Sequence, residues 1–255
     1  MSWLEVENLT LTFGGLKAVD NLSFSVEPDT VYTIIGPNGA GKSTVFNLIC
    51  RIYDPVAGDV RLGGESLLSA KPHQIVRRGI ARTFQNIELF EHATMLENLL
   101  IGRHSRDGFK PLRELFFAGR QLEQELAHRR KAEEVIEFLD LQAHRHARVS
   151  DLPYGIRKKV EIARALVAGP ELLLLDEPSS GLTTEETADI AFWIEHIKAD
   201  LGITVVMIEH DMKLVNKVSD KVLAIAEGRF LAEGTAAEVQ DNQDVQHAYL
   251  GTGHD

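Results

Sequence analysis

The chain has 255 residues, of which 44% are hydrophobic and 25% are charged, and this composition is typical of a globular protein. Its length fits one large α/β domain, or one domain that carries a smaller lobe. The formal net charge of −11 argues against a general nucleic-acid-binding protein, because such proteins usually carry a basic excess. The single cysteine, Cys50, cannot form an internal disulfide, and this favours a reducing compartment.

The N-terminal half begins with patterns of strands and turns. Apolar residues alternate with polar ones over 4–13 and 22–26, and this spacing predicts an antiparallel sheet. A buried strand is expected over 31–35, followed by a glycine-rich segment and an apolar helix that reaches Ile49. No segment has the composition of a secretory signal, and no uncharged apolar run reaches about 18 residues. If the protein acts at a membrane, another chain is expected to hold it there.

Residues 86–150 have a different character, because charged helical patterns dominate there. One predicted helix face carries Ala132, Val135, Ile136 and Leu139. We expect a helical lobe inserted into the α/β core. The alternative is a set of surface helices without a separate identity.

The core pattern resumes after residue 150. Four leucines at 172–175 and the apolar run 203–208 predict strands buried on both faces, with a helix between them. Strands that alternate with helices indicate a parallel sheet with right-handed crossovers. A hairpin is expected around Glu227 and Gly228, and Thr235 and Glu238 form the capping box of a last helix.

A phosphate-binding motif follows the strand at 31–35. The pattern G-x-x-x-x-G-K-[ST] is matched in full by Gly36, Pro37, Asn38, Gly39, Ala40, Gly41, Lys42, Ser43 and Thr44. Its glycines let backbone N–H groups point at phosphate oxygens, Lys42 adds a positive charge, and the Ser43 hydroxyl can ligate Mg²⁺. The strand before and the helix after argue against a chance glycine-rich turn.

Two adjacent acids follow the leucine run. Asp176 is expected to hold Mg²⁺ through its water shell, and Glu177 to orient and deprotonate an attacking water. An acidic turn after a core strand is the alternative, but the phosphate loop upstream makes it a weak one.

The order of these motifs resembles the ATP-binding cassette (ABC) superfamily. The resemblance implies a P-loop NTPase core of ABC ATPase type, with an N-terminal antiparallel β-subdomain and an inserted α-helical subdomain. On this interpretation the whole chain, 1–255, is one ABC ATPase domain. Its core spans about 1–85 and 151–235, its insert 86–150 and its C-terminal helix 236–255.

The same resemblance assigns roles to four further residues. Gln85 joins the Mg²⁺ shell and senses the transmembrane partner, and His210 contacts the γ-phosphate. Phe13 stacks on adenine, and Ala18 lines the same face. In isolation Gln85 could be a surface amide and Phe13 a core residue. His210 is the histidine that follows a core strand after the acidic pair.

The signature segment departs from the superfamily pattern Leu-Ser-Gly-Gly-Gln. Here the chain reads Leu-Pro-Tyr-Gly-Ile over 152–156, so that only Leu152 and Gly155 remain. Pro153 removes the serine hydroxyl and a backbone donor that face the γ-phosphate across a dimer. Gly155 is still expected to contact the nucleotide. Thr183 also stands where the family commonly has an aspartate.

A tyrosine-glycine signature resembles the ATP-binding subunits of branched-chain amino-acid importers, and so do residues 13–19, the long insert and residues 244–251. The resemblance implies ATP and Mg²⁺ as cofactors and a second ABC ATPase subunit as partner, expected to be non-identical in the complex, with a homodimer possible in isolation. Transmembrane permease subunits and, indirectly, a periplasmic binding protein complete the assembly, without nucleic acid. The chain is then expected at the cytoplasmic face of the plasma membrane, with residues 87–90 in the groove that receives the permease. Importers of this family also carry urea, amides or aromatic acids.

Two other functions remain open. A non-transport ABC ATPase that acts on ribosomes or DNA usually has two cassettes or a long coiled coil, and this chain has neither. A nucleotide-binding switch with weak turnover is suggested by Pro153, but the presence of Lys42, Gln85, Glu177 and His210 favours hydrolysis.

Overall fold

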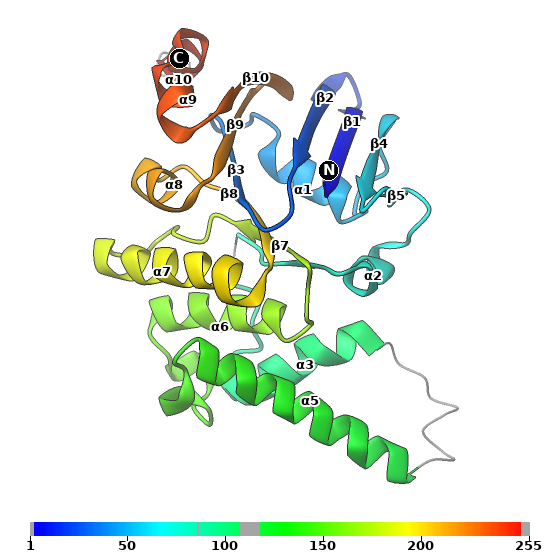
Figure 1. Ribbon diagram of the computed structural model, residues 1–255, viewed down its shortest axis with the longest axis vertical. Helices are drawn as coiled ribbons and strands as arrows, with labels where there is room; N and C mark the ends of the chain where they lie inside the picture. The colour runs from blue at the N-terminus through cyan, green and yellow to red at the C-terminus, as the bar shows by residue number, and fades with distance from the viewer. Residues whose placement is uncertain (1–2, 86, 108–117, 251–255) are drawn as a thin grey trace.

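The computed structural model describes residues 3–85, 87–107 and 118–250, and its described part contains two sheets (Figure 1). The larger sheet has the strand order β10-β9-β3-β8-β7-β6. Its strands are β3 (Val31–Ile35), β6 (Ile80–Arg82), β7 (Leu172–Asp176), β8 (Thr204–Ile208), β9 (Lys221–Ala226) and β10 (Arg229–Gly234). Neighbouring strands are parallel except for β9 and β10, which form the predicted hairpin.

The smaller sheet is antiparallel and has the order β2-β1-β4-β5. Its strands are β1 (Leu4–Phe13), β2 (Leu16–Val26), β4 (Ala57–Leu62) and β5 (Glu65–Ser66). It covers one face of the larger sheet together with α1 (Lys42–Ile49). The antiparallel N-terminal sheet that the alternating pattern predicted is therefore confirmed.

The larger sheet lies between two hydrophobic clusters, and its strands carry apolar side chains on both faces. All five residues of β7 are buried. Leu173 and Leu175 belong to the cluster on the helical side, whereas Leu172 and Leu174 belong to the cluster beneath the antiparallel sheet. Because side chains of a strand alternate between faces, a run of four leucines satisfies both layers at once.

Helices complete the two outer layers. The remaining ones are α2 (Pro72–Ile75), α3 (Met95–Asp107), α5 (Ala118–Phe138), α6 (Tyr154–Leu166), α7 (Thr184–Leu201), α8 (Met212–Val218), α9 (Ala236–Asp241) and α10 (Gln243–Leu250). Short 3₁₀ turns lie at Val76–Arg78, Gln142–His144 and Val149–Asp151. No helix in the described part of the chain is long and apolar enough to cross a membrane.

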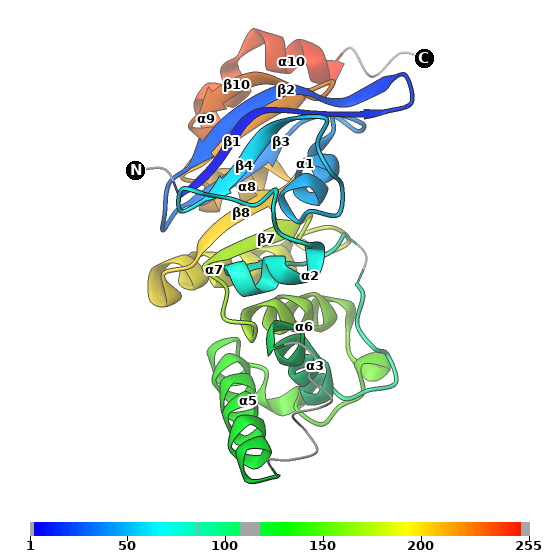
Figure 2. The same ribbon diagram turned by 90° about the vertical axis from the view of Figure 1, so that its right-hand side faces the viewer.

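The helical insert lies at one end of the molecule, beyond α6 and far from the antiparallel sheet (Figures 1 and 2). Helix α3 packs against both α5 and α6. The predicted apolar face is confirmed, since Ala132, Val135 and Ile136 of α5 are buried, and so is Leu139 just after its end. The exact boundaries of the subdomains stay predictions, and residues 1–2, 86, 108–117 and 251–255 of the predicted ranges lie outside the described residues.

The last helix was expected to be continuous, but the structure divides it into α9 and α10. Thr235 and Glu238 form the predicted capping box at the start of α9. Asn242 then takes an extended conformation, and its side-chain oxygen accepts hydrogen bonds from the backbone N–H groups of Asp244 and Val245. Because this side chain satisfies the first N–H groups of a new helix, the chain turns and starts again at Gln243.

Candidate nucleotide-binding site

The phosphate loop connects β3 to α1, and its lysine folds back over it. Lys42 is the first residue of α1. Its Nζ donates to the carbonyl oxygens of Gly36 at 2.7 Å and Pro37 at 3.0 Å. Burial lowers the pKa of Lys42, while the nearby carboxylates of Glu177 and Asp176 act in the opposite direction. A buried ammonium group with neutral carbonyl partners favours the arrival of an anion.

Close backbone contacts fix the loop against β2. Gly41 has φ +94°, and a Cβ placed on it would lie 2.3 Å from the carbonyl oxygen of Ala18. A Cβ placed on Gly228, in the turn between β9 and β10, would lie 2.6 Å from the same oxygen. The backbone N–H of Gly228 also donates to the carbonyl oxygen of Ala40. Glycine is required at both positions, so Gly228 belongs to the site although the sequence indicated only a hairpin turn there.

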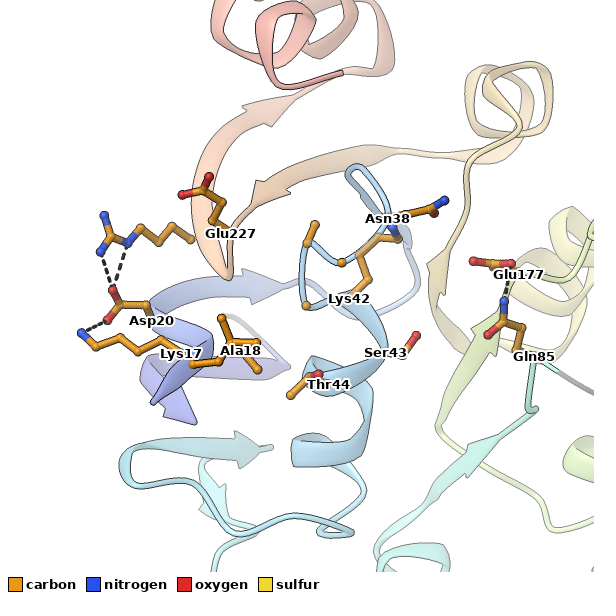
Figure 3. A pocket seen from close by; sticks show the side chains of 15 residues that line it. Lys17, Ala18, Asp20, Asn38, Lys42, Ser43, Thr44, Gln85, Glu177 and Glu227 are labelled. Carbon is orange, nitrogen blue, oxygen red and sulfur yellow. Dashed lines mark hydrogen bonds and ion pairs between the residues drawn. The ribbon is translucent and has the colours of Figure 1, made fainter. Parts of the chain in front are cut away.

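A cavity of about 720 Å³ opens in front of the loop, within the size range of small-molecule sites (Figure 3). Three groups of residues line it. The loop and the start of α1 supply residues 38–44, and Gln85 and Glu177 lie across from them. The third group, from β2 and the hairpin of β9 and β10, consists of Leu16, Lys17, Ala18, Asp20, Glu227 and Arg229.

The charged wall of the third group is held by ion pairs. Lys17 Nζ lies 2.9 Å from one carboxylate oxygen of Asp20, and Arg229 donates to the other at 2.9 and 2.6 Å. The hydrogen bonds from Lys17 and Arg229 lower the pKa of Asp20. Sequence reasoning missed all three residues, because Asp20 and Arg229 meet only through the tertiary fold.

Asp176 ends β7 and is buried beside a cation. Arg82 donates to its Oδ2 at 2.7 Å, and the same guanidinium donates to Asn47 Oδ1 at 2.6 Å. Asp176 Oδ1 is buried and has no hydrogen-bond partner among the described residues. An unpartnered buried carboxylate oxygen of this kind fits a site for a hydrated divalent cation.

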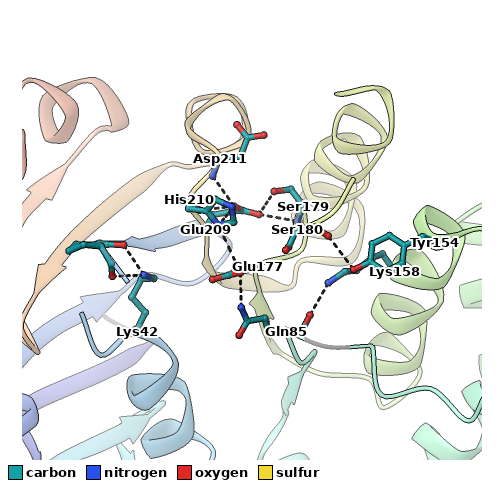
Figure 4. Close-up of polar contacts among 12 residues, drawn as sticks. Lys42, Gln85, Tyr154, Lys158, Glu177, Ser179, Ser180, Glu209, His210 and Asp211 are labelled. Atoms are coloured by element: carbon teal, nitrogen blue, oxygen red, sulfur yellow. Dashed lines mark hydrogen bonds and ion pairs between the residues drawn. The ribbon is translucent and has the colours of Figure 1, made fainter. Parts of the chain in front are cut away.

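Gln85, Glu177 and His210 come together from the segments that follow β6, β7 and β8 (Figure 4). Gln85 Nε2 donates to Glu177 Oε2 at 3.0 Å, and His210 Nδ1 lies 3.9 Å from the same oxygen. Glu177 has φ +49°, a left-handed backbone conformation that is rare for a side chain of this size. Such strain concentrates at functional sites. The structure thus places two of the predicted catalytic residues, Gln85 and His210, beside the carboxylate of a third, Glu177.

Two predicted contacts lie elsewhere. Phe13 is 46% exposed and packs edge-on against Tyr53, with ring centroids 5.2 Å apart, and it is absent from the cavity wall formed by the described residues. Ala18 does line the cavity, next to Leu16. Gly155 is also outside this wall. The adenine-stacking role of Phe13 and the nucleotide contact of Gly155 stay predictions.

The altered signature still begins a helix. Pro153 is the N-cap residue of α6, and Tyr154 donates from its hydroxyl to the carbonyl oxygen of Ser180 at 3.3 Å. Lys158 donates to the carbonyl oxygen of Gln85 at 3.2 Å (Figure 4). The signature helix is therefore tied to the loop after Glu177 and to the segment that carries Gln85.

Fold and site together define a P-loop ATPase of the cassette type. The sequence matches a family model described as "ABC transporter" over residues 19–180, and one described as "Branched-chain amino acid ATP-binding cassette transporter" over residues 231–255. The chain belongs to the ABC transporter ATP-binding family, whose members bind and hydrolyse ATP. Within it the chain resembles the ATP-binding subunits of branched-chain amino-acid importers.

Named relatives are similar to this chain over nearly its whole length. The chain is 42% identical to the high-affinity branched-chain amino acid transport ATP-binding protein BraF of Pseudomonas aeruginosa, and 38% identical to LivG of Escherichia coli K12. Each alignment covers 97% of both chains. Among solved structures, a nucleotide-free ATP-binding cassette of an ABC transporter has 34% identity and a TM-score of 0.86, over 97% of this chain and 98% of that one. The ADP conformation of the cassette MJ1267 has 33% identity and the same TM-score, over 98% and 99%.

Proposed function

We propose that this ATPase subunit energises the import of branched-chain or other hydrophobic amino acids. The observation that carries the ATPase part is the convergence of Lys42, Gln85 and Glu177 on one cavity. The amino-acid cargo rests on the relatives named above and on the branched-chain match at the C-terminus, because a cassette does not touch the transported molecule.

The hydrolytic step follows from the positions of the side chains. The loop N–H groups and Lys42 bind the phosphates of ATP. Ser43, Asp176 and Gln85 would hold Mg²⁺, which when bound adds positive charge beside the phosphates. A water oxygen attacks the γ-phosphorus, the bond to the bridging oxygen breaks, and ADP leaves with that electron pair. Glu177 accepts the proton of the water through its carboxylate.

His210 and Gln85 support that carboxylate. Gln85 donates to Glu177 Oε2, and this contact holds the side chain toward the cavity. His210 is 57% exposed on the side chain, so its ring is free to reach the γ-phosphate when ATP is bound. Because the Gln85 carbonyl oxygen also accepts a hydrogen bond from Lys158 on α6, a movement of α6 would displace Gln85 and, through its side chain, Glu177.

A second cassette and two permease chains complete the proposed machine. The exposed start of α6, with Tyr154 46% exposed, is the surface offered to the nucleotide of the other cassette. The cassette MJ0796, 22% identical and alike in fold, has been solved as a dimer. We propose a peripheral location at the cytoplasmic face of the membrane, where the permease holds the chain, and an indirect link to a substrate-binding protein.

Transport assays test the proposal. Cells that lack this chain should lose high-affinity uptake of labelled leucine, and the wild-type gene should restore it whereas a Glu177→Gln copy should not. Uptake of labelled urea and of an aromatic acid, measured in the same cells, distinguishes the other cargoes of related importers. Unchanged leucine uptake in the deletion strain would refute the cargo, and ATP hydrolysis by the purified chain would test the enzyme separately.

A further inference from the structure

The carboxylate of Glu209 lies beside the residues of the site, and none of the roles described above explains it. Glu209 follows β8 and directly precedes His210, and it is completely buried. Among the described residues, the only cation-forming side chain within 4.0 Å of its carboxylate is His210, whose Nδ1 lies 3.8 Å from Glu209 Oε2. Burying a carboxylate without a lysine or arginine is unfavourable unless hydrogen bonds to the charge compensate.

Hydrogen bonds to Glu209 come from two separate loops (Figure 4). Oε1 accepts from the backbone N–H of Ser179 at 2.9 Å and from its hydroxyl at 2.5 Å. Oε2 accepts from the backbone N–H groups of His210 at 2.7 Å and Asp211 at 3.0 Å. One oxygen therefore binds the loop after β7, and the other binds the loop after β8.

Those two loops carry the groups that must meet at the γ-phosphate. Glu177 lies two residues before Ser179, and His210 lies next to Glu209 itself. The strands beneath are paired, and just beyond β7 the Glu177 N–H donates to the carbonyl oxygen of Ile208, the last residue of β8, at 2.9 Å. Further out, the side chain of Glu209 joins the two loops by hydrogen bonds, beside the 3.9 Å approach of His210 Nδ1 to Glu177 Oε2.

We propose that Glu209 is a positioning residue that holds the loop of Glu177 and the loop of His210 in the relative positions that hydrolysis needs. This inference rests on the proposed function of the site. It explains why an acid, rather than an amide, occupies a buried position, because backbone N–H groups, which can only donate, face both oxygens.

Glu209→Gln is the sharpest perturbation. A glutamine has one carbonyl oxygen and one NH₂ group, and the NH₂ group cannot accept a hydrogen bond. If the NH₂ group lies toward the loop after β8, the backbone bonds from His210 and Asp211 are both lost. If it lies toward Ser179, the backbone bond is lost and the hydroxyl has to turn and accept instead of donate. We expect the turnover number for ATP to fall at least about tenfold, while the dissociation constant for ATP changes less than about threefold. Glu209→Asp keeps both acceptors but is one methylene shorter, so it should restore only part of the rate.

Glu233→Gln is the matched control. Glu233 is a partly buried acid on β10 that accepts from the Tyr32 hydroxyl at 2.5 Å and pairs with Lys221 Nζ at 2.7 Å, outside the cavity wall. It also ties neighbouring strands together, so its loss should lower the melting temperature. The turnover number of this variant should equal that of the wild type.

A spectroscopic readout tests the positioning itself. The imidazole proton resonances of His210, assigned by their loss in His210→Ala, should shift in nucleotide-free Glu209→Gln and stay unchanged in Glu233→Gln. Unshifted resonances, or a turnover number equal to that of the wild type, would overturn the inference. A fall in ATP affinity that matches the fall in rate would also overturn it, because it would indicate general damage. Since the resonances need no turnover, failure of the proposed function is distinguishable from failure of this inference.

Discussion

Two glycines of the phosphate loop allow backbone strain and steric contact to be separated. Gly39 and Gly41 have φ +79° and +94°, so an alanine is strained at either position. A Cβ on Gly39 meets nothing within 4 Å, whereas a Cβ on Gly41 would lie 2.3 Å from the carbonyl oxygen of Ala18. Gly39→Ala therefore measures the strain alone, and Gly41→Ala adds the contact.

The magnitudes follow from these geometries. An alanine in a left-handed conformation destabilises the folded state by about 1–2 kcal/mol. It also lowers the conformational entropy of the unfolded chain, and this stabilises the folded state by about 0.4–1 kcal/mol. Gly39→Ala should thus lower the unfolding free energy by about 1 kcal/mol, which is about 2–4 °C in melting temperature for a chain of this size. In Gly41→Ala the loop or β2 must move by at least 0.7 Å to reach a 3.0 Å contact. Overpacking of this kind adds about 1–3 kcal/mol.

Thermal unfolding without nucleotide, followed by circular dichroism, compares the two variants directly. The melting temperature of Gly41→Ala should fall below that of Gly39→Ala by at least about 2 °C. Equilibrium binding of a fluorescent ATP analogue should also weaken more in Gly41→Ala, because the whole loop shifts away from Ala18. Equal melting temperatures would refute the argument that the loop is pressed against β2.

Three further predictions concern buried or catalytic acids. Glu177→Gln should leave ATP binding intact and lower turnover by about 10²–10⁴-fold, and undiminished phosphate release would rule out Glu177 as the base. Asp176→Asn leaves the buried Arg82 guanidinium without its ionic partner, so the unfolding free energy should fall by about 3 kcal/mol, and an unchanged denaturant midpoint would contradict this. Burial raises the pKa of Glu161 above its ordinary value of 4.5. Between these two pKa values the folded chain holds a proton that the unfolded chain has lost, so the free energy of unfolding falls as the pH rises from the unfolded-state pKa to the folded-state pKa. The melting temperature of Glu161→Gln minus that of the wild type should therefore be more positive at pH 7 than at pH 4, and a pH-independent difference would refute the cause.

Much of the fold was readable from local pattern. The leucine run at 172–175 required burial on both faces, and the structure makes it a central strand of a parallel sheet. Motif spacing placed Lys42 and Glu177, which the structure brings to one cavity. These predictions succeeded because the information lies within a few neighbouring residues. The division of the last helix was missed, although Asn242 is a residue type that favours helix starts.

The rest of the site depends on distant contacts. Asp20 and Arg229 are 209 positions apart, and no local pattern links them. Glu209 resembled an ordinary polar residue after a strand, yet the fold encloses it completely. Arg82 likewise gave no signal of its bond to Asp176. Side chains of this kind derive their roles from what packs around them, and a single sequence does not show that.

The pairing of the central strand has a consequence for synthesis of the protein on the ribosome. Strand β3 leaves the ribosome early, but its two neighbours in the sheet, β8 and β9, begin only at Thr204 and Lys221. The turn at Gly228, which donates to the phosphate loop, comes later still. A nascent chain therefore carries its nucleotide motif for most of translation without a site around it, with both edges of an apolar strand unpaired. Such edges readily pair with other chains. The last fifth of the chain thus decides when the protein can first bind ATP, and until then the growing chain depends on protection from aggregation.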